Sequence, residues 1–204
     1  MNSANKKLGI LISGRGSNFL AIADSIESRK LPGAEIAIVI TNRAEAPGIV
    51  AARERELNAA VIEAKGRKRA EHDAEIVATL REHQVDLVCL AGYMRLLSPE
   101  FVRVFPQRIL NIHPSLLPAF PGLDAQRQAL DYGVQVSGCT VHFVDEELDH
   151  GVIILQRAVP VLPGDDEAAL SARILAEEHL AYSEAIARVL SGNYAIVGRR
   201  YEAR

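Results

Sequence analysis

The sequence has only two cysteines, a small net charge and no long apolar run, and each shortage excludes a class of protein. Two cysteines are too few for a disulfide-stapled scaffold, so we expect Cys89 and Cys139, which stand among apolar neighbours, to be buried thiols. The formal net charge is −3, which lacks the basic excess of nucleic-acid binders, so we expect no nucleic-acid partner. No apolar run approaches the roughly 20 residues of a membrane helix. We therefore expect no membrane insertion and a cytoplasmic location.

What the chain does contain is typical of a globular protein of one domain, over residues 1–204. In the first hundred residues, apolar runs alternate with stretches of helical spacing. Strands are expected over 8–13, 35–41, 60–63 and 86–91, and helices over 18–29, 46–57 and 68–83. His72 and His83 look like surface positions of the last of these helices. This alternation predicts an α/β fold with a mostly parallel, doubly wound, Rossmann-like sheet.

The second half has a different pattern. A strand is expected over 108–112, followed by an irregular segment rich in Pro and Leu and a short helix over 126–132. Two long β-type runs, 136–144 and 152–161, flank an acidic turn and predict an antiparallel hairpin. A long helix over 165–190 opens with two aspartates, which suit the positive end of its dipole. The pattern leaves the structure of the tail from Asn193 onwards open.

A glycine-rich turn, Ser13-Gly14-Arg15-Gly16-Ser17-Asn18, lies where the first strand meets the first helix. Glycines let backbone N–H groups approach a phosphate, and a helix N-terminus directs further N–H groups at it. Phe19 stands where a dinucleotide fingerprint has its third glycine, so a monophosphate is the better ligand. The alternative is an ordinary turn in which Ser17 or Asn18 caps the helix.

Asn111 and His113 are two residues apart at the end of a strand, so their side chains leave the same face. An amide beside an imidazole can stabilise the oxyanion of an acyl transfer. Asp149, in the acidic turn, could pair with His113 and help move a proton. Alternatively, His113 is a loop residue or a half-buried histidine with satisfied hydrogen bonds, and Asp149 is a solvent-facing acid. The spacing of the histidines predicts no metal site, and Ser115 lacks the surroundings of a nucleophile.

Taken together, these motifs closely resemble the folate-dependent glycinamide ribonucleotide transformylases. The resemblance runs from about Leu8 to Leu190. It is carried by the turn at 13–18, by Leu90-Ala91-Gly92-Tyr93-Met94-Arg95-Leu96-Leu97-Ser98, by Asn111-Ile112-His113-Pro114-Ser115-Leu116-Leu117-Pro118, and by Leu148-Asp149-x-Gly151.

The resemblance implies 10-formyltetrahydrofolate as co-substrate, glycinamide ribonucleotide as acceptor and purine biosynthesis as the pathway. It implies a phosphate-binding half over about 8–105 and a catalytic and folate-binding half over about 106–191. The implied catalytic residues are Asn111, His113 and Asp149, the implied phosphate ligands are Gly16, Ser17 and Asn18, and Glu178 would contact the ribonucleotide. The implied folate pocket is lined by Met94, Arg95, Leu97, Val144, Asp145, Glu146, Glu147 and Leu148. Without the resemblance, we would interpret Glu178 as an acid on the surface of a helix, and Met94 and Leu97 as residues of the apolar core.

One position departs from the family pattern: Asp124 stands where the family usually has a histidine near the catalytic group. A carboxylate there would change the charge around His113 and Asp149 and hence the pH optimum. The alternative is that Asp124 simply caps the helix that follows it.

Two other functions are compatible with these residues. A formyltetrahydrofolate deformylase would use the same side chains with water as acceptor, although such enzymes typically carry an N-terminal regulatory domain, for which there is no room before Leu8. A non-catalytic sugar-phosphate or folate-binding module would have lost activity through Asp124. The sequence leaves a homodimer open.

Overall fold

The computed structural model describes residues 5–204, which separate into two compact units with a boundary between Leu110 and Asn111. The elements of the first unit alternate along the chain, as the apolar pattern predicts. They are β1 (Lys6–Ile12), α1 (Ser17–Glu27), β2 (Ala34–Thr41), α2 (Pro47–Glu54), β3 (Ala59–Val61), α3 (Arg69–Glu82), β4 (Leu87–Leu90) and α4 (Pro99–Val104).

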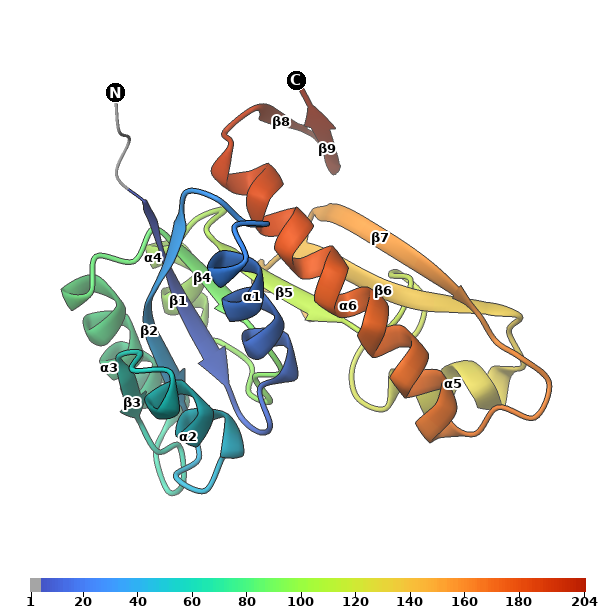
Figure 1. The fold of residues 1–204 in the computed structure, drawn as a ribbon, viewed down its shortest axis with the longest axis horizontal. Helices are drawn as coiled ribbons and strands as arrows, with labels where there is room; N and C mark the ends of the chain where they lie inside the picture. The colour runs from blue at the N-terminus through green and yellow to red at the C-terminus, as the bar shows by residue number, and fades with distance from the viewer. Residues whose placement is uncertain (1–4) are drawn as a thin grey trace. The chain divides into compact units, whose positions relative to one another are not determined.

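The strands of the first unit are parallel (Figure 1). β1 lies between β2 and β4, with Ile10 beside Val39 on one side and beside Cys89 on the other. β4 is buried along its whole length, because crossover helices cover both faces of such a sheet. The packing is tight at Gly9, where a Cβ atom would lie 2.4 Å from the Leu80 side chain of α3.

The second unit combines an antiparallel hairpin with one long helix. It contains α5 (Ala125–Tyr132), β6 (Val136–Phe143), β7 (Ile153–Pro160), α6 (Glu167–Leu190), β8 (Tyr194–Val197) and β9 (Arg200–Ala203), and β5 (Ile109–His113) leads into it. α6 runs along β6 and β7 (Figure 1) and packs against both. β6 and β7 pair with Thr140 opposite Gln156. The backbones approach so closely that a Cβ on Gly138 would lie 2.0 Å from the Arg157 carbonyl oxygen.

The hydrogen-bonded strand order is β3-β2-β1-β4-β5-β6-β7, and β8 and β9 form a separate two-stranded antiparallel sheet. The predicted fold class, a mostly parallel α/β sheet with an antiparallel hairpin towards the C-terminus, is therefore confirmed. The tail that the sequence left open is the β8–β9 hairpin, which Tyr194 joins to Phe143 through their aromatic rings. None of the helices in the described residues is long and apolar enough to cross a membrane.

Two local expectations were wrong. His72 is not a surface residue: it is fully buried on the same face of α3 as Ile76, and its Nε2 lies 2.8 Å from the Ile62 carbonyl oxygen. The sequence pattern also contained no helix after the Met94 segment, whereas α4 begins there with Ser98 as its cap. The cysteines are free and buried, as expected, and burial raises the pKa of the Cys139 thiol to about 12.

Candidate active site

A cluster of polar side chains gathers around the end of β5 in the second unit. Asn111 and His113 lie on the same strand face, and His113 is only 5% exposed. The His113 Nε2 is 2.8 Å from the Phe120 carbonyl oxygen, and its Nδ1 is 3.4 Å from a carboxylate oxygen of Asp149. Because both ring nitrogens face acceptors, a doubly protonated imidazole satisfies this arrangement. The structure therefore brings together the three residues predicted to be catalytic.

Asp149 is buried by the loop that carries it. Its side chain is 8% exposed, so the reading of a solvent-facing acid is wrong. Its backbone is left-handed, with φ of 50°, and its Oδ2 accepts a hydrogen bond of 2.8 Å from the Gly122 N–H. The loop then folds back so closely that a Cβ on Gly151 would lie 1.8 Å from the Phe143 carbonyl oxygen. A glycine two residues after Asp149 is thus what lets the carboxylate face His113.

His142 is a member of the cluster that sequence reasoning missed. It lies in β6, is 2% exposed, and its Nε2 is 3.3 Å from Asn111 Nδ2 and 3.8 Å from Asp149 Oδ1. Burial lowers the pKa of His142, which keeps the ring neutral near pH 7. The only signal in the sequence is a histidine inside an apolar strand, and that pattern does not say what the ring contacts.

Hydrogen bonds hold the segment after His113 in place, and they engage the Ser115 hydroxyl, so this residue is not a nucleophile. The Ser115 hydroxyl donates to the Ala119 carbonyl. The Thr140 hydroxyl donates to the Ser115 carbonyl at 2.7 Å and accepts from the Leu117 N–H at 3.0 Å. These side chains fix the path of the irregular segment, and hence the position of the Phe120 carbonyl that His113 contacts.

Asp124 is the N-cap residue of α5, and its carbonyl accepts a hydrogen bond from the Gln128 N–H. Its backbone is left-handed, with φ of 56°, and its side chain makes no capping hydrogen bond. The helix therefore begins at Ala125 as expected, but the aspartate side chain does not cap it. The residue is exposed, two positions after the Gly122 N–H that binds Asp149.

The acidic segment between β6 and β7 contains five of the residues predicted to line a folate pocket. Two of them are partly exposed, Val144 and Asp145, and three are exposed, Glu146, Glu147 and Leu148. His150 anchors the segment: its Nδ1 is 2.9 Å from Asp145 Oδ2, and Arg199, from the turn between β8 and β9, donates to its backbone carbonyl. The C-terminal hairpin thus fixes the loop that carries Asp149.

The predicted phosphate turn lies in the first unit and forms the N-terminus of α1. Gly16 is left-handed, with φ of 72°, and its carbonyl accepts the first helical hydrogen bond, from Leu20 N–H. A Cβ on Gly48 would lie 3.0 Å from the Gly14 carbonyl oxygen, so glycines allow the turn to rest on α2. Gly16 is the N-cap residue of α1 and Ser17 is its first helical residue, so the alternative that Ser17 or Asn18 is the cap is wrong.

The other three predicted folate residues lie in the segment after β4. Met94 is 70% exposed, which rules out the reading of core packing, and Leu97 is half-buried. The Met94 N–H donates to the Ser13 hydroxyl at 2.8 Å, which joins this segment to the phosphate turn.

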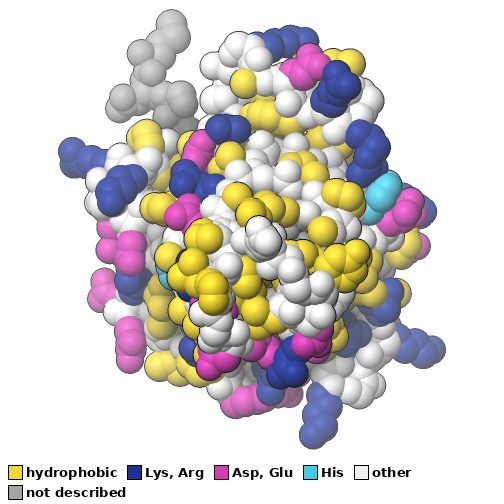
Figure 2. Space-filling view, turned by 90° about the vertical axis from the view of Figure 1, so that its right-hand side faces the viewer, with side chains coloured by type: hydrophobic (Ala, Val, Ile, Leu, Met, Phe, Trp, Pro, Cys, Tyr) yellow, Lys and Arg dark blue, Asp and Glu magenta, His cyan; other side chains and the backbone are white. Residues whose placement is uncertain are grey.

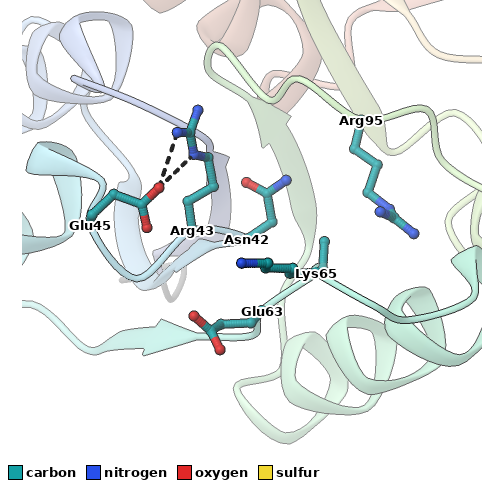
Figure 3. A pocket seen from close by; sticks show the side chains of 7 residues that line it. Asn42, Arg43, Glu45, Glu63, Lys65 and Arg95 are labelled. Carbon is teal, nitrogen blue, oxygen red and sulfur yellow. Dashed lines mark hydrogen bonds and ion pairs between the residues drawn. The ribbon is translucent and has the colours of Figure 1, made fainter.

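Arg95 lines a pocket of about 370 Å³ in the first unit (Figure 3). Its Nε atom is buried without a hydrogen-bond partner. Lys65 and Arg43 also line the pocket, and Arg43 is paired with Glu45 at 3.0 Å. The full lining is Asn42, Arg43, Glu45, Glu63, Ala64, Lys65 and Arg95.

Glu178 lies on the buried face of α6 and is only 7% exposed. The reading of a helix-surface acid is therefore wrong. A carboxylate on the apolar face of a helix is costly unless it is paired or hydrogen-bonded. Among residues 5–204, no group of three or more His, Cys, Asp or Glu side chains is arranged to hold a metal ion.

Comparison with known proteins identifies the family. The sequence model of the formyl transferase family matches residues 6–186. The phosphoribosylglycinamide formyltransferase of Escherichia coli is 44% identical over 174 residues, which are 85% of this chain and 82% of that protein. The human trifunctional purine biosynthetic protein adenosine-3 is 48% identical over 91% of this chain, which spans only 18% of that protein's length.

Solved structures agree with the sequence matches. Glycinamide ribonucleotide transformylase 1 from Symbiobacterium toebii has a TM-score of 0.95 and 50% identity, covering 98% of this chain and 94% of that one. A formyltetrahydrofolate deformylase from Pseudomonas syringae has a TM-score of 0.92 at 25% identity, and this chain covers 66% of it. The resemblance inferred from the motifs is confirmed: this chain belongs to the formyl transferase family.

Proposed function

We propose that this chain transfers a formyl group from 10-formyltetrahydrofolate to the amine of glycinamide ribonucleotide in purine biosynthesis. Membership of the formyl transferase family and the likeness to the Escherichia coli and Symbiobacterium toebii proteins support the acceptor and the donor. The observation that carries the proposal is the buried His113–Asp149 pair, with Asn111 beside it on the same strand.

The reaction requires charge stabilisation and one proton movement. The amine nitrogen attacks the formyl carbon, and the carbonyl electron pair moves to the oxygen. The positive charge of the protonated His113 ring and a hydrogen bond from an Asn111 N–H stabilise that oxyanion in a site with little water. When the oxyanion collapses, the bond from carbon to N10 of the folate breaks, N10 gains a proton and the attacking nitrogen loses one. The Asp149 carboxylate, buried beside His113, holds the imidazolium in place and assists this proton transfer.

The phosphate of the ribonucleotide binds at the turn before α1. The first N–H groups of a helix have no partner within the helix, and they attract an anion together with the helix dipole. Gly16, Ser17 and Asn18 stand at this position. Glu178 binds a hydroxyl of the ribose, since a carboxylate on the buried face of α6 accepts hydrogen bonds from hydroxyl groups.

The folate is held by Met94, Arg95 and Leu97 and by the segment Val144–Leu148. Exposed apolar side chains such as Met94 and Leu148 suit the ring system. Arg95 suits the glutamate carboxylates of the folate, because its buried Nε lacks a hydrogen-bond partner and Lys65 lines the same pocket.

Arg95→Gln tests this role. We expect the Michaelis constant for 10-formyltetrahydrofolate to rise about tenfold, because a charge-assisted hydrogen bond is worth roughly 1.5–3 kcal/mol. The constant for the ribonucleotide should stay the same. Arg55→Gln, which removes a cation of the first unit that is paired with Asp24 and Glu27 and does not line this pocket, is the matched control. An unchanged folate constant in the Arg95 variant would remove that residue from the folate site.

The decisive assay follows folate release from 10-formyltetrahydrofolate by absorbance, with and without glycinamide ribonucleotide, across pH 5 to 9. Release that depends on the ribonucleotide supports the transferase. Release without it would favour the hydrolase reading, for which the Pseudomonas syringae deformylase is the structural precedent. Ribonucleotide binding with no release at any pH would leave a binding module.

The protein works in the cytoplasm without a nucleic-acid partner, in keeping with its net charge of −3, and a second copy of the chain is its expected partner. Figure 2 shows hydrophobic side chains gathered on the face at the α5 end of the second unit. Exposed apolar side chains of this unit include Tyr132, which is 80% exposed, and Val136, which is 54% exposed. Exposed apolar surface suits a protein contact. Sedimentation velocity over a wide concentration range tests the dimer, and a single species of monomer mass throughout would contradict it.

A further inference from the structure

The cluster around Asn111, His113 and Asp149 contains one ionisable side chain, His142, that has no role in the proposed reaction. The role inferred for it below rests on the proposed function. His142 is 2% exposed in the middle of the second unit, yet both of its ring nitrogens have polar neighbours. A buried imidazole with two directed contacts holds a fixed orientation, so the question is what that orientation does for the residues beside it.

The protonation state follows from the first contact. His142 Nδ1 lies 2.7 Å from the Phe143 carbonyl oxygen, an atom that only accepts hydrogen bonds, so Nδ1 carries a proton. Burial disfavours a second proton on the ring. Nε2 is then unprotonated, and its lone pair accepts a hydrogen bond.

The second contact is between this lone pair and the amide of Asn111. Asn111 Nδ2 lies 3.3 Å from His142 Nε2, and an amide nitrogen only donates. This bond decides which way the Asn111 amide faces and uses one of its two N–H groups. We propose that His142 is a positioning residue that holds the Asn111 amide so that its second N–H is available to the formyl oxygen.

The charged groups around the ring explain why a neutral histidine is needed there. Asp149 Oδ1 is 3.8 Å from His142 Nε2, and His113 and Asp145 also act on the ring electrostatically. A protonated His142 would donate to Asp149, compete with His113 for that carboxylate and leave the Asn111 amide without its acceptor. The neutral ring therefore keeps Asp149 for His113 while it orients Asn111.

Two substitutions of similar polarity separate this role from a structural one. In His142→Gln the amide reaches as far as Nε2 and offers an oxygen to Asn111, whereas in His142→Asn it ends near the position of Nδ1. We expect kcat to fall about 10- to 100-fold in His142→Asn and less than about fivefold in His142→Gln, with both Michaelis constants within about threefold. Equal kcat losses in the two variants would overturn the proposal.

A double-mutant cycle tests whether the effect passes through Asn111. In an Asn111→Ala background, His142→Asn should lower kcat by less than about twofold, since the amide to be oriented is absent. A further loss as large as in the wild-type background would show that His142 acts independently of Asn111 and would overturn the proposal.

Nitrogen NMR of the histidine rings gives a readout that needs no activity, so it separates this proposal from the proposed reaction. We expect His142 in the wild-type protein to show a protonated Nδ1 and an unprotonated Nε2 near pH 7. We also expect the Asn111 side-chain amide signals to shift more in His142→Asn than in His142→Gln. A protonated Nε2 would overturn the proposal even if formyl transfer were observed.

Discussion

The proposed chemistry depends on a few side chains that, taken one at a time in the sequence, gave no sign of a catalytic role. His113 before a proline suggests a loop or half-buried residue, and Asp149 in an acidic turn suggests a solvent-facing acid. Together they form a buried pair with a distance of 3.4 Å between Nδ1 and Oδ2. Burial changes what the pair can do, because a charge interaction in a site with little water is stronger than the same interaction in solvent.

His113→Ala tests the oxyanion role. We expect kcat to fall about 10²- to 10³-fold, because the preorganised positive charge that stabilises the oxyanion is lost, while ribonucleotide binding is retained. Steady-state kinetics and calorimetric binding of the ribonucleotide measure the two quantities. His83→Ala, which removes a partly buried histidine of the first unit whose Nδ1 lies 2.9 Å from the Thr79 carbonyl oxygen of α3, is the matched control. Near-normal turnover in His113→Ala would rule out the assigned role.

Asp124→Asn tests the departure from the family pattern. Asparagine tolerates the left-handed backbone, so only the charge changes. Asp124 stands two residues after the Gly122 N–H that binds Asp149, so an effect of its charge on the cluster should appear as a change in kcat. The change should be less than about fivefold, because salt screens exposed charges. A kcat identical to that of the wild type from pH 5 to 9 would mean that Asp124 has no influence on the cluster.

At the scale of elements, the two aspartates Asp165 and Asp166 predicted the start of α6, and each has a different role in the structure. The side chain of Asp166 caps the helix by accepting from the Ala169 N–H at 2.8 Å. Asp165 binds the Arg173 guanidinium at 2.7 Å and accepts from the Leu162 N–H. The sequence showed that acids stand at this helix end. The ion pair between Asp165 and Arg173 could not be predicted, because it depends on how the loop before the helix folds.

This pairing predicts an acid-sensitive contribution to stability. The Arg173 guanidinium, and then the Leu162 N–H, lower the pKa of Asp165 from 3.8 to about 2. A carboxyl with a lowered pKa in the folded state stabilises the protein above its unfolded pKa, and the effect is lost as the pH falls through the folded value. Between pH 4 and 2, the free energy of unfolding should therefore fall less steeply in Asp165→Asn than in the wild type.

Urea denaturation at several pH values measures this slope. Glu202→Gln, which removes an exposed carboxylate of β9, is the matched control and should keep the wild-type slope. Identical slopes for the wild type and Asp165→Asn would show that the ion pair does not contribute.

At the scale of the whole molecule, ligand binding should increase the stability of the folded protein against unfolding. A ligand that binds only the folded state stabilises it by about 2.7 kcal/mol at 100 times its dissociation constant. We expect glycinamide ribonucleotide to raise the melting temperature, and the dephosphorylated nucleoside to raise it much less, as followed by calorimetry. In Ser17→Ala, the ribonucleotide should stabilise less at equal concentration, because a donor near the phosphate is gone. Equal stabilisation by the two ligands in the wild type would contradict a phosphate site at the turn before α1.

What the sequence by itself determined is local. The apolar runs predicted the order of strands and helices, the glycines marked the turn before α1, and the two-residue spacing put Asn111 and His113 on the same strand face. These features depend on neighbours in the chain, through backbone sterics and the periodicity of buried side chains.

Only the tertiary structure decided which distant residues meet. Asp149 faces His113 because Gly151 lets the loop close over β6, and His142 reaches Asn111 because the two strands place them together. The burial of Glu178 and His72 was likewise invisible, since an isolated charged residue in a helix does not show which face packs against the sheet. Such contacts join segments far apart in the chain, and the packing of the whole unit, not local propensity, fixes them.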